Sequence, residues 1–115
     1  MTAQEKTMPA PVLKEANNDV LYVGKLTGPA HGEVTPHGDM TVGDKVEFTV
    51  QTSTGNHWSG TKRVEPVPLV MVFAIPKETF EKGLVPDATA KLRYRVTSAS
   101  GNQADSIDLV VQLKP

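Results

Sequence analysis

Two stretches of this sequence alternate regularly between apolar and polar residues, which is the pattern of a β-strand with one buried face. They are 45–50 and 90–97, and a third segment, 106–113, is expected to close the domain with its apolar residues facing inward. The composition agrees, because 15 valines and 12 threonines favour strands, while nine glycines and nine prolines favour turns. The chain is therefore expected to consist mainly of strands joined by turns.

Shorter apolar stretches between turn signals predict further strands. These stretches are Val12–Leu13, Val20–Val23, 31–36, 58–64 and 69–75. The segment 77–82 follows Pro76, carries Glu78 early and is followed by Gly83, as a short helical turn does. A helical turn between two long strands resembles the connection before the sixth strand of immunoglobulin-like domains. We predict an all-β, immunoglobulin-like antiparallel β-sandwich of about seven strands, with a barrel as the alternative.

The length of the chain predicts a single domain. A chain of 115 residues can form one hydrophobic core without disulfides or other covalent cross-links. The polar segment 1–11, interrupted by Pro9 and Pro11, is predicted to be a flexible N-terminal arm, and 12–115 to be the sandwich domain. The residues expected to form its core are Val46, Phe48, Val50, Phe73, Ile75, Leu92, Tyr94, Val96, Ile107, Leu109 and Val111.

Charge and composition argue against several classes of protein. The formal net charge of −1 argues against a nucleic-acid-binding surface, and the lack of cysteine excludes disulfides and thiolate metal sites. The longest apolar run, 69–75, is far shorter than the roughly 20 residues that a membrane span needs. The first residues hold no apolar stretch, so no secretion signal is predicted there. We expect no cofactor, no nucleic-acid partner and no membrane insertion.

The order of these signals resembles an immunoglobulin-like module of Gram-negative bacteria. The resemblance rests on a proline-rich entry, a Gly-Asp turn before an alternating strand, and a Phe-x-x-Pro stretch before a short helix. In this chain the matching segments are Pro9-Ala-Pro11, Val20-Leu-Tyr-Val23, Met40-Thr-Val-Gly-Asp-Lys-Val-Glu-Phe48 and Phe73-Ala-Ile75-Pro76, with Asp39 at the place of a usual glycine. Such modules often occur as tandem repeats in large surface or secreted proteins of the adhesin-like or invasin-like kind. The resemblance implies a sandwich fold, a binding or spacer role and a surface or secreted location.

The sequence offers no arrangement typical of an enzyme. No serine lies in a Gly-x-Ser-x-Gly elbow, and no glycine cluster could cradle a phosphate. We therefore predict a monomeric, non-enzymatic binding or structural module of a bacterial surface, secreted or antigen-like protein. The alternative is a cytoplasmic subunit that pairs through an exposed edge strand, such as 106–113 or 31–36.

Two polar loops are the predicted binding surface. Both 51–57 and 98–105 are rich in Ser, Thr, Asn, Gln and Gly, the adaptable hydrogen-bonding residues of binding loops. The predicted strand order places both loops at one end of the sandwich, where they would bind a protein or glycan ligand. The candidate residues are Thr52, Ser53, Thr54, Asn56, His57, Ser100, Asn102 and Gln103.

Trp58 and His57 support another interpretation, a carbohydrate-binding module in which the indole stacks on a sugar ring. Trp58 also fits the core tryptophan of such sandwiches, or a partly exposed residue at a strand edge. The sequence leaves these three interpretations of Trp58 open.

A row of cations on 90–97 is expected to face outward. Lys91, Arg93 and Arg95 would either bind an acidic partner or pair across the sheet with Glu47 and Asp108. Because the net charge is close to zero, we favour the pairing.

The densest group of metal-ligand residue types lies in 31–39. In an extended strand His31 and Glu33 share a face, whereas Pro36 bends the chain before His37. The spacing matches no established zinc pattern. His31, Glu33 and His37 are therefore weak candidates, and the segment is interpreted as a polar edge strand and turn.

Overall fold

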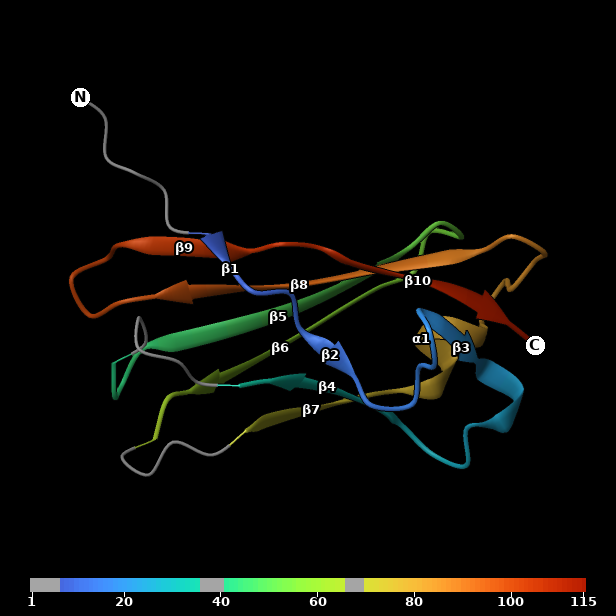
Figure 1. The fold of residues 1–115 in the computed structure, drawn as a ribbon, viewed down its shortest axis with the longest axis horizontal. Helices are drawn as coiled ribbons and strands as arrows, with labels where there is room; N and C mark the ends of the chain where they lie inside the picture. The colour runs from blue at the N-terminus through green and yellow to red at the C-terminus, as the bar shows by residue number, and fades with distance from the viewer. Residues whose placement is uncertain (1–6, 36–40, 66–69) are drawn as a thin grey trace.

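The computed structural model describes residues 7–35, 41–65 and 70–115 and folds them into an all-β sandwich of two sheets (Figure 1). The predicted fold class is confirmed. Seven of the strands in the described residues have four or more residues, and three others have two or three.

The larger sheet, sheet A, is built around two long central strands. Its members are β1 (Thr7–Met8), β3 (Val20–Tyr22), β5 (Lys45–Thr52), β6 (His57–Arg63), β8 (Thr89–Thr97), β9 (Gln103–Ser106) and β10 (Leu109–Lys114). β5 pairs antiparallel with β6 and β8, and the other side of β8 pairs with β9 and β10. The two short N-terminal strands run parallel to their partners, β1 to β9 and β3 to β10.

The smaller sheet, sheet B, covers the inner face of sheet A. Its members are β2 (Val12–Leu13), β4 (Ala30–Val34) and β7 (Met71–Ile75), all antiparallel, with β4 in the centre. The short strands near the start of the described chain are divided between the sheets, with β1 and β3 in sheet A and β2 in sheet B.

The core lies between the inner faces of the two sheets. Phe48 of β5 stacks on Phe73 of β7, with ring centroids 5.1 Å apart, so an aromatic pair joins sheet A to sheet B. Gly32 of β4 faces the end of the Phe48 ring, where an added Cβ would lie only 2.6 Å from Cζ. Among the residues expected in the core, the buried ones are Val46, Phe48, Val50, Phe73, Ile75, Leu92, Tyr94, Val96 and Val111.

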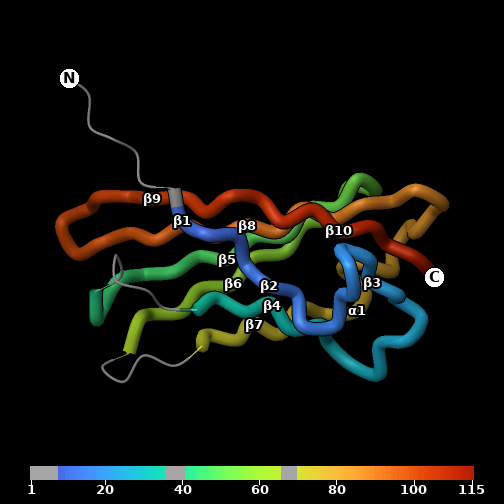
Figure 2. The backbone as a smooth tube through the Cα atoms, in the orientation of Figure 1, coloured from blue at the N-terminus to red at the C-terminus, as the bar shows by residue number. Residues whose placement is uncertain are grey.

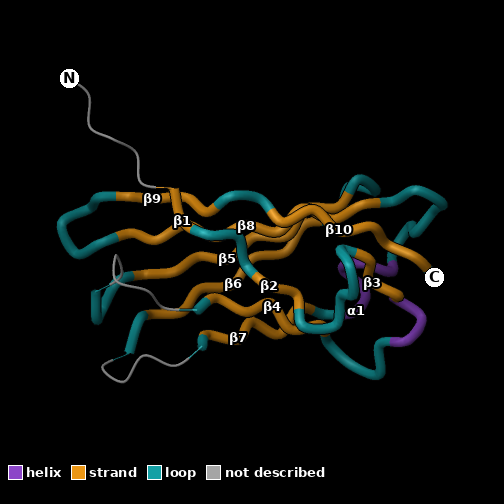
Figure 3. Tube along the Cα trace, viewed as in Figure 1, coloured by secondary structure: helices purple, strands orange, loops and turns teal. Residues whose placement is uncertain are grey.

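Two helical segments lie at one end of the sandwich (Figure 3). The predicted helical turn is confirmed as α1 (Lys77–Glu81), and a 3-10 turn, η1, spans Val23–Lys25. Lys77 joins the two, because its Nζ donates a hydrogen bond to the carbonyl of Leu26 at 3.1 Å. The C-terminal residue, Pro115, lies beside Gly24 at this same end.

The last strand is broken, contrary to the prediction for 106–113. β9 ends at Ser106 and β10 begins at Leu109, and the side chain of Ile107 between them is 57% exposed. The N–H of Ile107 donates to the carbonyl of Met8 instead of extending the ladder with β8. The prediction that Ile107 faces inward is therefore wrong, and Leu109 is only half-buried. β9 also takes Gln103–Asp105 out of the predicted loop 98–105.

Both segments proposed as free edge strands lie inside their sheets. β10 is flanked by β8 and β3, and β4 is flanked by β2 and β7. The prediction of pairing through either of them is therefore wrong. Among the described strands, β6 pairs only with β5, and its Lys62 lies on the core side with Nζ 5.9 Å from the centroid of the Phe73 ring. A charge on the inner side of an edge strand discourages edge-to-edge association.

The motif residues that carry the resemblance have local structural roles. Gly43 adopts a positive φ of 91°, which glycine tolerates at no steric cost. Asp44 is buried, and its carboxylate accepts the N–H of Thr41 at 2.9 Å, which closes the turn before β5. Pro76 stands directly before α1, where its fixed φ suits the start of a helix.

Candidate functional site

The two loops predicted to form one binding surface lie at opposite ends of sheet A. In the register of β5 with β8, Thr52 pairs with Ala90 and Lys45 pairs with Thr97. The loop after β5 therefore lies where β8 begins, whereas 98–102 lies where β8 ends, roughly 23 Å away. The prediction that these loops share an end is wrong, because antiparallel neighbours bring the end of one strand to the start of the other.

Asn56 connects the β5–β6 hairpin to helix α1. Its Nδ2 donates hydrogen bonds to the carbonyl of Thr79 at 2.9 Å and to the carbonyl of Lys82 at 2.8 Å. These carbonyls belong to the last turn of a five-residue helix, where backbone acceptors lack partners within the helix. Both amide hydrogens of the Asn56 side chain are thus used within the protein.

The rest of this hairpin loop is also held internally. Thr52 is buried, and its Oγ1 accepts the N–H of Asn56 at 2.9 Å and lies 2.9 Å from Oγ1 of Thr54. Ser53 is tied to Thr89 by two hydrogen bonds, one through its N–H and one through Oγ. Loop residues that were predicted to bind a ligand therefore fix the loop to β8 and α1.

Replacing Asn56 with aspartate is expected to lower the unfolding free energy by about 1–3 kcal/mol, because two helix-end carbonyls lose their donors and face a carboxylate. Chemical denaturation followed by circular dichroism measures this. The matched control is Asn102→Asp, since among the described residues Asn102 Nδ2 donates only to Ser100 Oγ, at 3.3 Å in an exposed loop. We expect the control to change the free energy by about 0.5 kcal/mol or less. Equal losses of unfolding free energy in both variants would contradict the role of Asn56 in joining the hairpin to α1.

The second loop, 98–102, closes on itself. Ser98 accepts the N–H of Asn102 through Oγ at 3.1 Å and lies 2.9 Å from Ser100 Oγ. The backbone adds a hydrogen bond from Ser98 N–H to the carbonyl of Asn102 at 2.8 Å. Gln103, the remaining candidate, is an exposed residue of β9 opposite Thr97.

Trp58 and His57 lie on opposite faces of β6. Trp58 pairs with Val50 on the core side, is half-buried, and extends over Gly60, where an added Cβ would lie 2.7 Å from the indole. His57 pairs with Gln51 on the outer side and is exposed. Consecutive strand residues point to opposite faces, so these two side chains cannot form one sugar platform.

His31 is held by an acidic residue next to it. Glu15 accepts the backbone N–H of His31 at 2.7 Å and lies 2.6 Å from the ring Nδ1. Partial burial acts to raise the pKa of Glu15, but these hydrogen bonds and the charge of His31 together lower the pKa below its ordinary value. Glu33 lies on the same strand, and His37 lies outside the described residues. Within the part of the chain that the structure describes, no three such ligands converge on a metal position.

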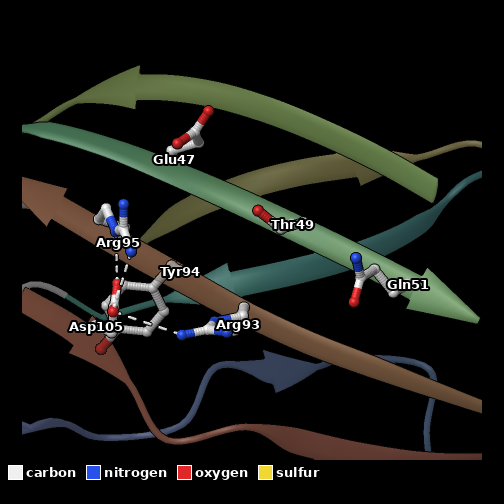
Figure 4. Close-up of a pocket in the computed structure, with 7 residues that line it drawn as sticks. All are labelled: Glu47, Thr49, Gln51, Arg93, Tyr94, Arg95 and Asp105. Carbon is white, nitrogen blue, oxygen red and sulfur yellow. Dashed lines mark hydrogen bonds and ion pairs between the residues drawn. The ribbon is translucent and has the colours of Figure 1, made fainter.

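A polar hollow of about 230 Å³ lies on the outer face of sheet A (Figure 4). Thr49 stands at its centre, between the longer side chains of Glu47 and Gln51 on β5. Arg93 lies directly opposite Thr49 on β8, and Arg95 lies opposite Glu47. The hollow exists because short and long side chains alternate along this face. The sequence predicted the row of cations on this face but not the hollow.

The cations around the hollow are paired with carboxylates, as the sequence favoured. Arg95 makes a two-pronged contact with Asp105, Nε to Oδ1 at 2.7 Å and Nη2 to Oδ2 at 3.2 Å. This contact raises the pKa of Arg95 and holds the pKa of Asp105 below its usual value. Arg93 is held more loosely, 3.5 Å from Asp105 and 3.7 Å from Asp108. Asp105 is thus the main partner of the row, and the sequence prediction had not named it.

The buried Tyr94 also borders the hollow from β8, and burial raises the pKa of its hydroxyl to about 12. Because the folded-state pKa lies above the ordinary value of 10.0, burial favours the neutral form. The resulting stability is full below pH 10 and is lost as the pH rises towards 12, by about 2–3 kcal/mol in all. Unfolding free energies of the natural chain and of Tyr94→Phe, measured from pH 8 upwards, isolate this effect. Parallel curves would contradict it.

No protein-family model, no curated protein and no solved structure matches this chain. Within the described ranges, no helix has the length and apolar character needed to cross a membrane.

Proposed function

We propose that this chain is a non-enzymatic structural or binding module of a bacterial surface, secreted or antigen-like protein, and that its main role is that of a spacer. The bacterial and surface assignment rests on the motif resemblance described above. The spacer role rests on one structural observation, the parallel pairing of the first strands with the last ones.

This pairing connects the two ends of the sandwich. β1 lies beside β9, near the loop 98–102, while Pro115 lies beside Gly24 at the end where the helical segments gather (Figure 1). Between them, β3 and β10 run side by side in parallel over Val20–Tyr22 and Gln112–Lys114. Tension that enters β3 at its start and leaves β10 at its end loads all the hydrogen bonds of this pair together. Such a domain resists stretching along its length.

The direction of pulling tests the spacer role. The chain has no cysteine, so Lys14→Cys and Lys25→Cys each supply a single handle, and the C-terminus supplies the other. Both lysines are exposed and they flank β3. A handle at 14 loads the β3–β10 pair in shear, whereas a handle at 25 peels β3 from the same end. We expect the first geometry to unfold at clearly higher force. Equal forces would contradict a role in carrying tension.

Binding of a saccharide is the second candidate function, and the hollow over Thr49 favours it. Three cations and three carboxylates surround this face, namely Lys91, Arg93, Arg95, Glu47, Asp105 and Asp108. Because these charges balance, a neutral ligand is favoured over a simple ion. The Glu47 carboxylate accepts hydrogen bonds, the Arg93 guanidinium donates them, and Thr49 and Gln51 do both, which suits adjacent sugar hydroxyls.

Filling the hollow tests this candidate. Thr49→Arg places a long side chain in the hollow, while Val72→Arg places the same side chain on the exposed face of β7 in sheet B, away from the lining residues. Glucose, galactose, mannose and N-acetylglucosamine serve as probes in calorimetric titrations. The candidate requires that a sugar binds the natural chain and Val72→Arg but not Thr49→Arg. Failure of all four sugars to bind the natural chain would remove it.

A further inference from the structure

The first described residues form a short strap, here the N-terminal strap, over Thr7–Pro11. It leaves β1 on sheet A and crosses to β2 on sheet B (Figure 2). Met8 is its anchor, with only 3% of the side chain exposed, and Pro11 is buried as well. Two of the residues predicted to belong to a flexible arm are thus part of a sheet.

The seat of the strap has two parts. One is the outer edge of β9, where Thr7 pairs with Asp105 and Met8 with Ser106, and where the carbonyl of Met8 accepts the N–H of Ile107. The other is the apolar space that Met8 fills in the core. Without the strap, the edge of β9 would lose its only described partner on that side, and the space would be empty. The seat therefore suits an extended segment with one apolar anchor.

Few backbone hydrogen bonds hold the strap at its seat. Its ladder contains two residue pairs, and Pro9 and Pro11 have no N–H with which to extend it. Because prolines favour an extended chain on either side of Ala10, the strap needs no turn to reach its seat. Within the described chain the strap joins the rest of the domain only at β2, so a change in backbone direction at that one point is enough to release it.

One large apolar side chain lies uncovered beside the seat. Ile107 directly follows β9 and donates its N–H to the strap, yet its side chain is 57% exposed. A second molecule that sat close to the seat would cover this side chain, which the molecule's own strap leaves in solvent.

We propose that the seat also receives the N-terminal strap of a second copy of this chain, so that two molecules exchange Met8. The exchanged strap makes the same contacts as the resident one, and concentration decides between the two forms. This assembly goes beyond a spacer role, since it would connect modules side by side where they are crowded.

A trans-peptide experiment on the full chain tests the exchange. Met8→Asp prevents the strap from entering the apolar space and leaves the seat open to a synthetic peptide of residues 1–13. We expect the peptide to bind the Met8→Asp chain at least about tenfold more tightly than the natural chain, whose own strap competes. Backbone amide shifts in NMR spectra should appear at Ser106 and Ile107. A peptide that itself carries Met8→Asp is the control and should not bind.

The oligomeric state of the natural chain gives an independent readout. Sedimentation over a rising concentration series is expected to show a dimer that Met8→Asp abolishes, while Lys14→Asp, an exposed change just past the strap, leaves it intact. A dimer that persists in Met8→Asp would overturn the proposal. So would a natural chain that stays monomeric at millimolar concentration, or equal peptide binding to both chains. Spectra of Met8→Asp that lack β-sheet dispersion would also overturn it, because the seat would then not exist without the strap.

Discussion

Replacing Phe48 with alanine is expected to lower the unfolding free energy by about 3–5 kcal/mol, the usual loss for a fully buried phenylalanine. None of the Phe48 side chain is exposed, and its ring stacks on Phe73 across the two sheets. Its far end fills the space over Gly32. Removing the ring leaves a cavity that neighbouring side chains cannot fill unless whole strands move, because the cavity lies between two hydrogen-bonded sheets.

Chemical denaturation of Phe48→Ala measures this loss. The control is Ile107→Ala, which also removes a large apolar side chain, but one that is 57% exposed. We expect the control to change the free energy by less than about 1 kcal/mol. Identical denaturation midpoints for the two variants would contradict the placement of Phe48 between the sheets.

Gly32→Ala is expected to destabilise the domain by about 1–3 kcal/mol through overpacking. The added Cβ would lie 2.6 Å from Cζ of Phe48 and 3.0 and 3.1 Å from its Cε1 and Cε2. The ring cannot move away because Phe73 stacks against it. Gly28→Ala is the matched control, since a Cβ there would meet no atom within 4 Å. A loss no larger than that of the control would contradict the close approach of β4 to β5.

Combining Phe48→Ala with Gly32→Ala tests whether the two residues are in contact. In the Phe48→Ala background the obstacle to a side chain at position 32 is gone, so Gly32→Ala should cost little or even fill part of the cavity. A double-mutant cycle is therefore expected to show strong coupling between the two positions. Additive losses would mean that the two residues are not in contact.

Regular alternation was enough to predict the long strands, because one face of each is fully buried. In β5 and β8 every second residue is buried, and these residues meet across the two strands as Val46–Val96, Phe48–Tyr94 and Val50–Leu92. The helical turn was predictable as well, since Pro76, Glu78 and Gly83 are local signals. These features depend on residues that lie close together in the sequence.

Features that depend on distant contacts were not predictable in this way. Ile107 follows the alternation of 106–113, but its N–H donates to the strap and its side chain is exposed. Asn56 has the composition of a binding loop, and only the packing of α1 against the hairpin shows that it joins the two. The position of the loops could have been predicted by assuming that 45–50 and 90–97 pair as antiparallel neighbours. That pairing places 51–57 and 98–105 at opposite ends of the sheet.

The sequence correctly predicted that the row of cations pairs with carboxylates, but it missed one of the partners, Asp105. The alternation of 90–97 places Lys91, Arg93 and Arg95 on the outer face, and the predicted pairing with Asp108 is confirmed for Lys91 and Arg93. Asp105 had been placed in a loop, so its contact with Arg95 could not be expected. Glu47 lies opposite Arg95 and helps to raise the pKa of that guanidinium.

The central claim is that the two polar loops use their hydrogen-bonding groups within the protein, and that a saccharide ligand binds on the outer face of sheet A. The most direct test is a proton–nitrogen NMR spectrum of the chain, recorded alone and then with zinc, a glycan mixture and extracellular-matrix proteins. We expect 53–56 and 98–102 to remain unshifted with every probe, and any shifts to gather around Thr49 and Arg93. Shifts that cluster in the two loops would contradict the account and restore the loops as the binding surface.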